Sequence, residues 1–285
     1  YGQCPFAITA CCIVFVTRRR VRLLLQTLTA RDEVASDPMK PCRVATWNLD
    51  GYRNNAPSRL PQQIEVLQSL LADIVVLTEV QDTTKLPGMQ FWWSDPGKPP
   101  YKPRDRAVGI ASTWIGKALN VRDSRLSVCV CLDAPLPLGR LIVYGTVIPY
   151  AMDGVRQKAA VAWERHHKAV DDVVADLSDL RSDPAFVDSR IVVAGDFNTS
   201  LDGSNWYGHP GARSRLVEGL NGAGFQCHTR ENIRLTRAAD RAIVDHIWTT
   251  AELLPVEPLH IWCDRSHPNR LSDHNGVALS LAAKE

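Results

Sequence analysis

The sequence predicts an α/β protein in which two mixed β-sheets pack face to face with helices on the outside. Two observations carry this prediction. From Arg43 onward, apolar runs of strand length alternate with turn residues, and amphipathic stretches at helical spacing occur between them. No internal repeat and no linker divides residues 40–285. We therefore expect one domain of mixed strands and helices.

The expected strands are short apolar runs bounded by turn residues. Residues 74–77 form a continuous apolar run, which is typical of a strand covered on both faces. Pro135, Pro137 and Gly139 indicate a hairpin-type connection, whereas the four prolines and glycines in residues 91–101 indicate a loop. The predicted strands are residues 44–47, 74–77, 107–111, 126–132, 141–148, 191–194, 242–248, 259–262 and 276–281, with another near Phe225.

Three segments have the apolar periodicity of helices. One long helix is expected from about residue 154 to residue 180, and a shorter one over residues 214–220. We assign His166 and His167, on the long helix, to the surface or an interface. The first helix follows Pro57 and has Leu60, Ile64, Leu67 and Leu71 on one face.

Composition indicates an ordinary globular protein, with 45% hydrophobic and 22% charged residues. The net charge of +2 gives no general attraction to polyanions, so a nucleic acid would have to bind a local patch. The eight cysteines include no Cys-x-x-Cys pair and no zinc-site spacing. We interpret them as reduced thiols and expect a cytoplasmic protein.

The N-terminal region differs from the rest of the chain. Residues 6–16 form an apolar run of 11 residues, and Arg18, Arg19 and Arg20 follow after Thr17. The run is too short for a stable membrane span, and a signal peptide would carry its charges before the run. We interpret residues 1–38 as an N-terminal extension outside the fold and residues 39–285 as the domain. A short membrane or surface anchor is the alternative.

Four short polar motifs occur at the ends of predicted strands. Strand ends hold side chains rigidly, as chemistry that depends on positioning requires. Carboxylates, amides and an imidazole brought together in this way suit a hard divalent cation and a phosphate ester. The motifs are residues 47–51 (WNLDG), 77–79 (LTE), 195–198 (GDFN) and 272–275 (SDHN).

The first two motifs predict a metal site. Asn48 and Asp50 lie two apart, so in an extended chain they share a face, and Glu79 ends another strand. Carboxylate and amide oxygens are the ligands that Mg²⁺ and Mn²⁺ favour. For Asp50, which precedes Gly51, a simple turn role is the alternative.

The remaining motifs predict acid–base chemistry. Asp196 can orient or deprotonate a water molecule, and Asn198 can donate to a developing oxyanion. Asp245 follows another strand, and we expect it to fix the imidazole of His274. His246, adjacent to Asp245 in a strand, faces the opposite way and is assigned to packing.

The ordered set of motifs resembles the endonuclease/exonuclease/phosphatase superfamily across about residues 43–281. The resemblance implies a four-layered α/β sandwich and magnesium-dependent hydrolysis of a phosphoester, with Mn²⁺ as a possible substitute. It makes Glu79 the principal metal ligand, with Asn48 and Asp50 near it and Asp273 assisting. It also implies the following catalytic residues: Asp196 positioning the water, Asn198 contacting the phosphate, and Asp245 orienting His274, with Asn48 beside them.

One position departs from the family pattern. Val147 stands where members often carry a tyrosine or histidine that contacts the phosphate, and Tyr150 is the candidate to supply a hydroxyl instead. Arg106 ends a loop that gathers four cations beside Tyr101. Trp206 follows the GDFN motif and offers a stacking surface or an apolar wall.

The predicted function is that of a phosphodiesterase of nuclease type, monomeric and with nucleic acid as the expected substrate. A phosphatase or phosphodiesterase acting on a lipid headgroup, an inositol phosphate or a small phosphorylated metabolite is the alternative. A third possibility is a non-catalytic binding module on the same fold.

Overall fold

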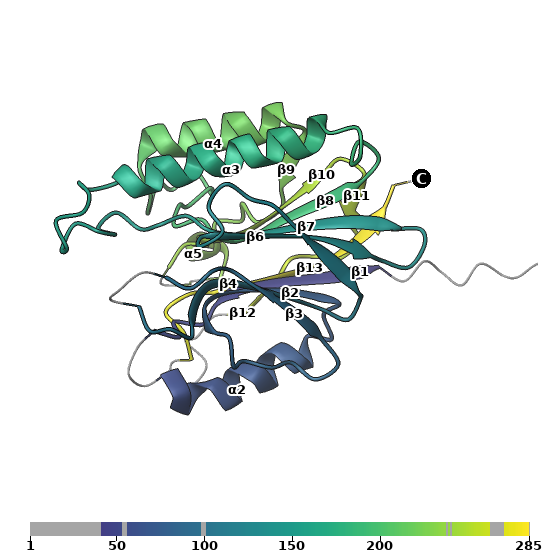
Figure 1. Ribbon diagram of the computed structural model, residues 1–285, viewed down its shortest axis with the longest axis horizontal. Coiled ribbons are helices and arrows are strands. Elements are labelled where there is room, and N and C mark those ends of the chain that lie inside the picture. The colour runs from purple at the N-terminus through teal and green to yellow at the C-terminus, as the bar shows by residue number, and fades with distance from the viewer. Residues whose placement is uncertain are drawn as a thin grey trace, which may run out of the picture. The chain divides into compact units, whose positions relative to one another are not determined.

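A computed structural model describes residues 41–52, 56–97, 101–237, 239, 241–262 and 271–284. In this part of the chain, two mixed β-sheets lie against each other and helices cover both outer faces (Figure 1). Helix α2 (Ala56–Ser69) covers one sheet, and helices α3 (Glu164–Ser182) and α4 (Pro210–Gly222) cover the other. The predicted four-layered α/β sandwich is therefore confirmed. The predicted extension, residues 1–38, lies outside the described residues.

The first sheet has the strand order β11-β13-β1-β2-β4-β3, with β12 also pairing with β13. Strands β1 and β2 are parallel, and Asn48 lies opposite Thr78 at their carboxyl ends. Strand β13 is antiparallel to β1, so its amino end lies at the same edge. The strands are β1 (Cys42–Asn48), β2 (Ile74–Gln81), β3 (Gln90–Trp93), β4 (Asp105–Ser112), β11 (Leu253–Pro255), β12 (His260–Trp262) and β13 (Gly276–Ala283).

The second sheet has the strand order β5-β6-β7-β8-β10-β9. Strands β7 and β8 are parallel and joined through α3, whereas β10 runs antiparallel to β8. The pairing of β8 with β10 places Asp196 opposite Asp245. The strands are β5 (Gly116–Leu119), β6 (Ser127–Asp133), β7 (Arg140–Val147), β8 (Arg190–Asp196), β9 (Phe225–Cys227) and β10 (Asp245–Thr250).

The main core lies between the two sheets. Alternate residues of the strands point into it, among them Val44 and Val76 from one sheet and Val143 and Val192 from the other. Two further apolar clusters lie under the helices, one beneath α2 and one beneath α3 and α4. Burying each such side chain stabilises the fold by roughly 1.5–3 kcal/mol, so the strand ends are held on a rigid base.

The predicted long helix is wrong over its first ten residues. Helix α3 begins at Glu164, and the preceding segment forms turns with left-handed backbone at Gly154, Lys158 and Trp163, whose φ angles are 77°, 54° and 66°. Three left-handed residues cannot be part of a right-handed helix. The apolar spacing of this segment therefore does not reflect helical structure.

The predicted loop over residues 91–101 is also wrong in its first part. Residues Gln90–Trp93 form β3, which pairs with β4. The three aromatic residues of this strand favour extended structure, and the prolines and glycine begin only at Pro96.

Within the described residues, no helix is long and apolar enough to cross a membrane.

Candidate active site

Five polar side chains meet where the ends of the two sheets lie together. Asn48 and Glu79 come from β1 and β2 of one sheet, and Asp196 and Asp245 come from β8 and β10 of the other. His274 lies just before β13. Parallel neighbours place their carboxyl ends at one edge, which is why segments far apart in the sequence converge here.

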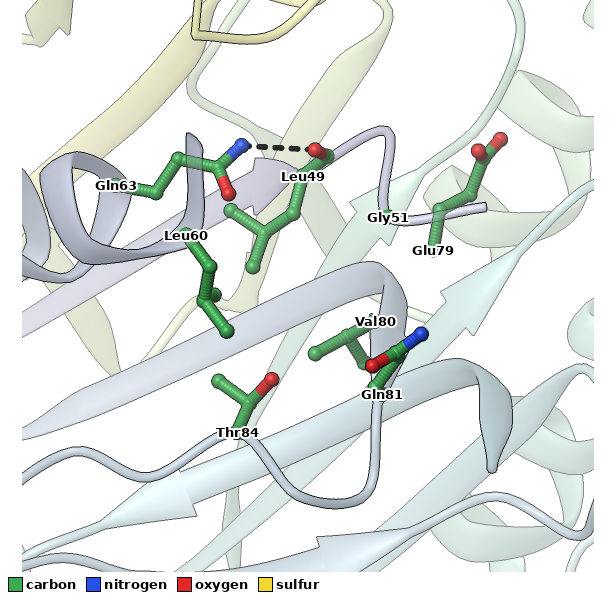
Figure 2. Close-up of a pocket in the computed structure, with 8 residues that line it drawn as sticks. All are labelled: Leu49, Gly51, Leu60, Gln63, Glu79, Val80, Gln81 and Thr84. Carbon is green, nitrogen blue, oxygen red and sulfur yellow. Dashed lines mark hydrogen bonds between the residues drawn. The ribbon is translucent and has the colours of Figure 1, made fainter. Parts of the chain in front are cut away.

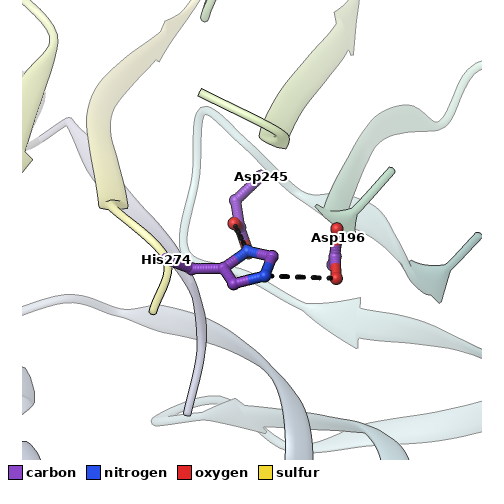
Figure 3. Close-up of side chains that lie close together, drawn as sticks. All are labelled: Asp196, Asp245 and His274. Atoms are coloured by element: carbon purple, nitrogen blue, oxygen red, sulfur yellow. Dashed lines mark hydrogen bonds and ion pairs between the residues drawn. The ribbon is translucent and has the colours of Figure 1, made fainter. Parts of the chain in front are cut away.

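The imidazole of His274 lies between two buried carboxylates (Figure 3). Its Nδ1 is 2.6 Å from Oδ2 of Asp245, and its Nε2 is 4.0 Å from Oδ2 of Asp196. The predicted contact between Asp245 and His274 is therefore present. Burial alone would lower the pKa of His274, but Asp245 and Asp196 outweigh it and raise the pKa to about 10.

These three residues are also a tight group of possible metal ligands, with their ligand atoms within 4.8 Å of one another. The 2.6 Å contact with Asp245 occupies His274 Nδ1, so only Nε2 of the imidazole could face an added group. The arrangement suits an imidazolium whose Nδ1–H is held by Asp245. Its Nε2–H then points toward Asp196.

The carboxylate of Asp196 accepts three hydrogen bonds. Asn48 Nδ2 and Asn198 Nδ2 each donate to Oδ2 at 3.0 Å, and the backbone N–H of Asn198 donates to Oδ1 at 2.8 Å. Burial raises the pKa of Asp196, and the nearby Asp245 and Glu79 add to the effect against the opposing charge of His274. A carboxylate with a raised pKa is better suited to accept a proton from water.

The amide nitrogen of Asn198 bonds within the protein. Its Nδ2 donates to Ile148 O at 3.0 Å as well as to Asp196. An amide nitrogen has two hydrogens, so both are used. Donation to a phosphate, as the sequence predicts, would replace one of these bonds. In this structure Asn198 holds Asp196 in place.

Glu79 is half-buried in an acidic environment at the end of β2. Burial raises the pKa of its carboxyl, as do Asp273 and Asp50, whereas His274 and a hydrogen bond from Asn48 lower it. Such crowding of acidic groups is relieved by a bound cation. The side chains available to bind a cation here offer oxygen atoms as ligands, which fits Mg²⁺ or Mn²⁺.

The expectation that Asn48 and Asp50 share a face in extended geometry is wrong. Asp50 has a φ of 51°, and its backbone N–H donates to Asn48 Oδ1 at 2.8 Å, so the chain turns here. The Asp50 carboxylate accepts from Arg59 Nη1 at 3.2 Å, and Arg59 Nη2 donates to the Asp50 carbonyl at 2.9 Å. A cation would have to compete with this arginine for Asp50.

Left-handed backbone recurs at the site. Glu79 and Asn198 have φ angles of 47° and 45°, close to that of Asp50. Each such residue stores about 1–3 kcal/mol of strain, and glutamate tolerates the conformation less well than aspartate or asparagine. Gly51 N donates to Glu79 O at 2.8 Å, and a Cβ on Gly51 would lie 2.2 Å from that oxygen. Gly51 thus permits the close approach that fixes Glu79, and sequence reasoning missed this role.

The predicted substrate-binding residues differ in availability. Tyr150 and Trp206 are 47% and 38% exposed, and the Arg234 guanidinium lies 5.9 Å from the Trp206 ring centroid. Arg106 instead forms an ion pair with Asp82 and donates to Pro103 O at 2.7 Å, so its charge is largely engaged.

The sequence also predicted how Val147 and the cationic loop relate to a bound phosphate. Val147 packs against the core between the sheets, so this position offers no polar group to a substrate. Residues 98–100 of the predicted cationic loop lie outside the described residues.

Two buried histidines support the loops that follow β7 and β8. His246 Nε2 lies 2.8 Å from Thr199 O and its Nδ1 lies 2.8 Å from Thr229 Oγ1, which confirms its packing role. The surface assignment of His166 is wrong, because it is fully buried and its Nδ1 lies 2.7 Å from Pro149 O. His166 lies four residues before the buried Val170 and so on the same face of α3, which is the sequence signal that indicates its burial. Burial lowers the pKa of both histidines to about 4.

A small pocket is lined by residues that follow β1, by residues of α2 and by the last residues of β2 (Figure 2). Glu79 lies at its edge, with its carboxylate directed away from Leu60 and Thr84. The lining residues include none of the three residues drawn in Figure 3. Its lining residues are Leu49, Gly51, Leu60, Gln63, Glu79, Val80, Gln81 and Thr84.

Comparison with solved structures shows that several proteins of low sequence identity share this fold. The chain is similar to the human Nocturnin catalytic domain with bound sulfate (14% identity, TM-score 0.59, covering 86% of this chain and 95% of that one). It is also similar to an AP endonuclease from Archaeoglobus fulgidus (16% identity, TM-score 0.60, covering 86% and 100%). The endonuclease domain of TRAS1, a telomere-specific non-LTR retrotransposon, matches at 15% identity with a TM-score of 0.53, covering 86% and 100%. Comparison with curated protein sequences gave no match.

The sequence profile of the Endonuclease/Exonuclease/phosphatase family matches residues 45–274, a span that includes every motif residue from Asn48 to His274. Enzymes of this family hydrolyse phosphoester bonds and generally depend on divalent metal ions. The match confirms the resemblance inferred from the motifs, and the chain belongs to the Endonuclease/Exonuclease/phosphatase family.

Proposed function

We propose that this protein is a magnesium-dependent phosphodiesterase of nuclease type, in which a water activated by Asp196 attacks the phosphorus atom. The observation that carries the proposal is the placement of a buried carboxylate beside a charged imidazole, with the acidic Glu79 next to both. Hydrolysis of a phosphodiester requires a proton acceptor for water and positive charge at the phosphoryl oxygens. This site supplies both.

The proposed reaction assigns a separate role to each side chain. Asp196 accepts the proton of the water as the new P–O bond forms and the ester P–O bond breaks, and the departing ester oxygen leaves as an alcohol after taking a proton from solvent water. Asp245 holds His274 as an imidazolium, whose Nε2–H stabilises the negative charge that develops on a phosphoryl oxygen. Loss of one such donor typically reduces the rate by about 10²–10³-fold.

Glu79 and Asn48 would hold the divalent cation, with Asp273 close to them. When bound, the cation supplies Lewis-acid stabilisation of the charge on the phosphate. Asp50 is the weakest of the predicted ligands because Arg59 already engages its carboxylate. Mn²⁺ would suit the same oxygen donors.

Nucleic acid is the proposed substrate class. Exposed Trp206 with Arg234 beside its ring offers a base-stacking surface together with positive charge for the backbone. A lipid headgroup or another small phosphorylated compound is the second candidate, because Tyr150 and Met152, 47% and 45% exposed, place apolar surface just after β7. We further propose that the protein acts as a monomer in the cytoplasm, which suits the free thiols of Cys42, Cys129, Cys131 and Cys227.

The test is a cleavage assay with Mg²⁺ on plasmid, abasic-site duplex, single-stranded DNA, phospholipids and inositol phosphates. We expect cleavage of at least one substrate, its loss in EDTA, and a reduction of about 10²–10³-fold in Asp196→Ala and His274→Ala. Glu218→Ala, on the exposed face of α4, is the matched control. Equal activity in Asp196→Ala and wild type would refute the mechanism. A wild-type protein that cleaves none of the substrates would favour a non-catalytic binding module.

A further inference from the structure

The inner face of helix α2 carries two polar residues at positions where apolar ones are expected. Arg59 and Gln63 lie four residues apart and share a face with Leu67. Gln63 is 2% exposed and Arg59 is 8% exposed. A buried polar side chain destabilises the fold unless its donors and acceptors are bonded. What these side chains bond to therefore indicates why they are buried.

Gln63 joins two loops of the active site. Its Nε2 donates to Leu49 O at 2.8 Å and to Leu271 O at 2.6 Å, so both amide hydrogens are used (Figure 2 shows the first bond). Leu49 lies between Asn48 and Asp50, on the metal side of the site. Leu271 begins the segment that carries His274, on the acid–base side.

The two loops also contact each other directly. Ser272 Oγ donates to Asn48 O at 2.5 Å, and Trp47 Nε1 donates to His274 O at 3.1 Å. These bonds hold the segment before β13 against the end of β1. The bonds from Gln63 also attach both loops to α2. This helix packs on the sheet through its apolar side chains.

We propose that Gln63 is a positioning residue for catalysis: its amide fixes the separation of the metal-binding loop and the loop that presents His274. It touches neither the substrate nor the reacting atoms, and it acts through Asn48 and His274. Removing the amide breaks the bonds of both loops to Gln63 and leaves the catalytic side chains unchanged, whereas Arg59 still ties Asp50 to α2. The kinetic part of this inference rests on the proposed function, whereas the geometric part does not.

The perturbation is Gln63→Met, which keeps the length of the side chain and removes both donors. Gln68→Met, at an exposed position on the same helix, is the matched control. A displacement of about 1 Å in a catalytic group costs roughly 100-fold in rate. We expect kcat to fall by about that factor with KM within threefold of wild type, and no change in Gln68→Met. We also expect Gln63→Met and Ser272→Ala to be non-additive in kcat, because both act on the same segment.

A spectroscopic readout tests the geometry without any substrate. His274 Nδ1 lies 2.6 Å from Asp245 Oδ2, and the proton between these two atoms should give a far-downfield NMR signal in histidine-labelled protein. The signal is identified by its loss in His274→Gln. We expect Gln63→Met to shift or broaden this signal and Gln68→Met to leave it as in wild type. If Gln63→Met does not fold, Gln63→Glu keeps the shape and, when protonated, one donor, and it should show the same change to a smaller degree.

The outcomes separate the two proposals. Wild-type protein that cleaves none of the substrates refutes the proposed function, and the NMR signal then decides the role of Gln63 alone. An unchanged His274 signal in folded Gln63→Met overturns the positioning role. So does a loss of stability with an unchanged kcat, because that result would make Gln63 a purely structural residue.

Discussion

Acid should destabilise this protein through the buried His246. Its side chain is fully buried and neutral, bonded to Thr199 O and Thr229 Oγ1, and burial lowers its pKa from 6.5 to about 4. In the unfolded chain the imidazole takes up a proton below pH 6.5, whereas in the folded protein it does so only near pH 4. Protonation therefore favours the unfolded state. The stabilisation is complete above pH 6.5 and is lost as the pH falls toward 4.

The size of this effect follows from the two pKa values of His246. Between pH 7 and pH 5, a shift from 6.5 to about 4 corresponds to a loss of about 2 kcal/mol in the free energy of unfolding. His246→Gln keeps one donor and one acceptor but does not titrate. Urea denaturation at both pH values should show a loss smaller by about 2 kcal/mol in this variant than in wild type. His166 is present in both proteins, so its own titration cancels, and an equal loss in the two would refute the reasoning.

Three further predictions concern the site and the sheets that carry it. Mg²⁺ at a hundredfold excess over its Kd should stabilise wild type by about 3 kcal/mol, which thermal unfolding would detect as a rise in Tm. Glu79→Gln should show no such rise, and an equal rise in this variant would place the metal elsewhere. Asp245→Asn should lower kcat by about 10²–10⁴-fold in a steady-state assay while KM stays close to wild type, because it removes the partner that orients and charges His274. Gly145→Ala should destabilise the protein by about 1–3 kcal/mol in thermal unfolding, because a Cβ at Gly145 would lie 2.9 Å from Val108 of the other sheet, and unchanged stability would contradict this close packing.

The strand-end motifs could be predicted because their signals are local. An apolar run followed by a polar group marks the end of a buried strand, and parallel pairing brings such ends together. Asn48 and Glu79 follow this rule, and so does Asp196. The antiparallel pairing that sets Asp245 opposite Asp196 was not predicted, because no local signal in the sequence says which strands pair.

Other features could not be predicted because their causes lie far away in the sequence. Asp50 turns out of extended geometry where Arg59 engages it from the following helix. Helix α3 starts late because Trp163 adopts a left-handed conformation that its residue type does not suggest. Gln63 is one of several polar residues on α2, and only the two carbonyl oxygens that it meets set it apart.

The contacts of the site also join the two sheets, so the proposed catalysis depends on the spacing between the sheets. Asn48 of one sheet donates to Asp196 of the other, and His274 beside the first sheet is held by Asp245 of the second. Each half of the proposed chemistry therefore uses groups from both sheets. A change in the spacing of the sheets would alter the Asn48–Asp196 and His274–Asp245 distances together, even when it arises deep in the core between them. Because a packed core resists such changes, the apolar layer between the sheets is what keeps proton acceptor, imidazolium and metal ligands in register.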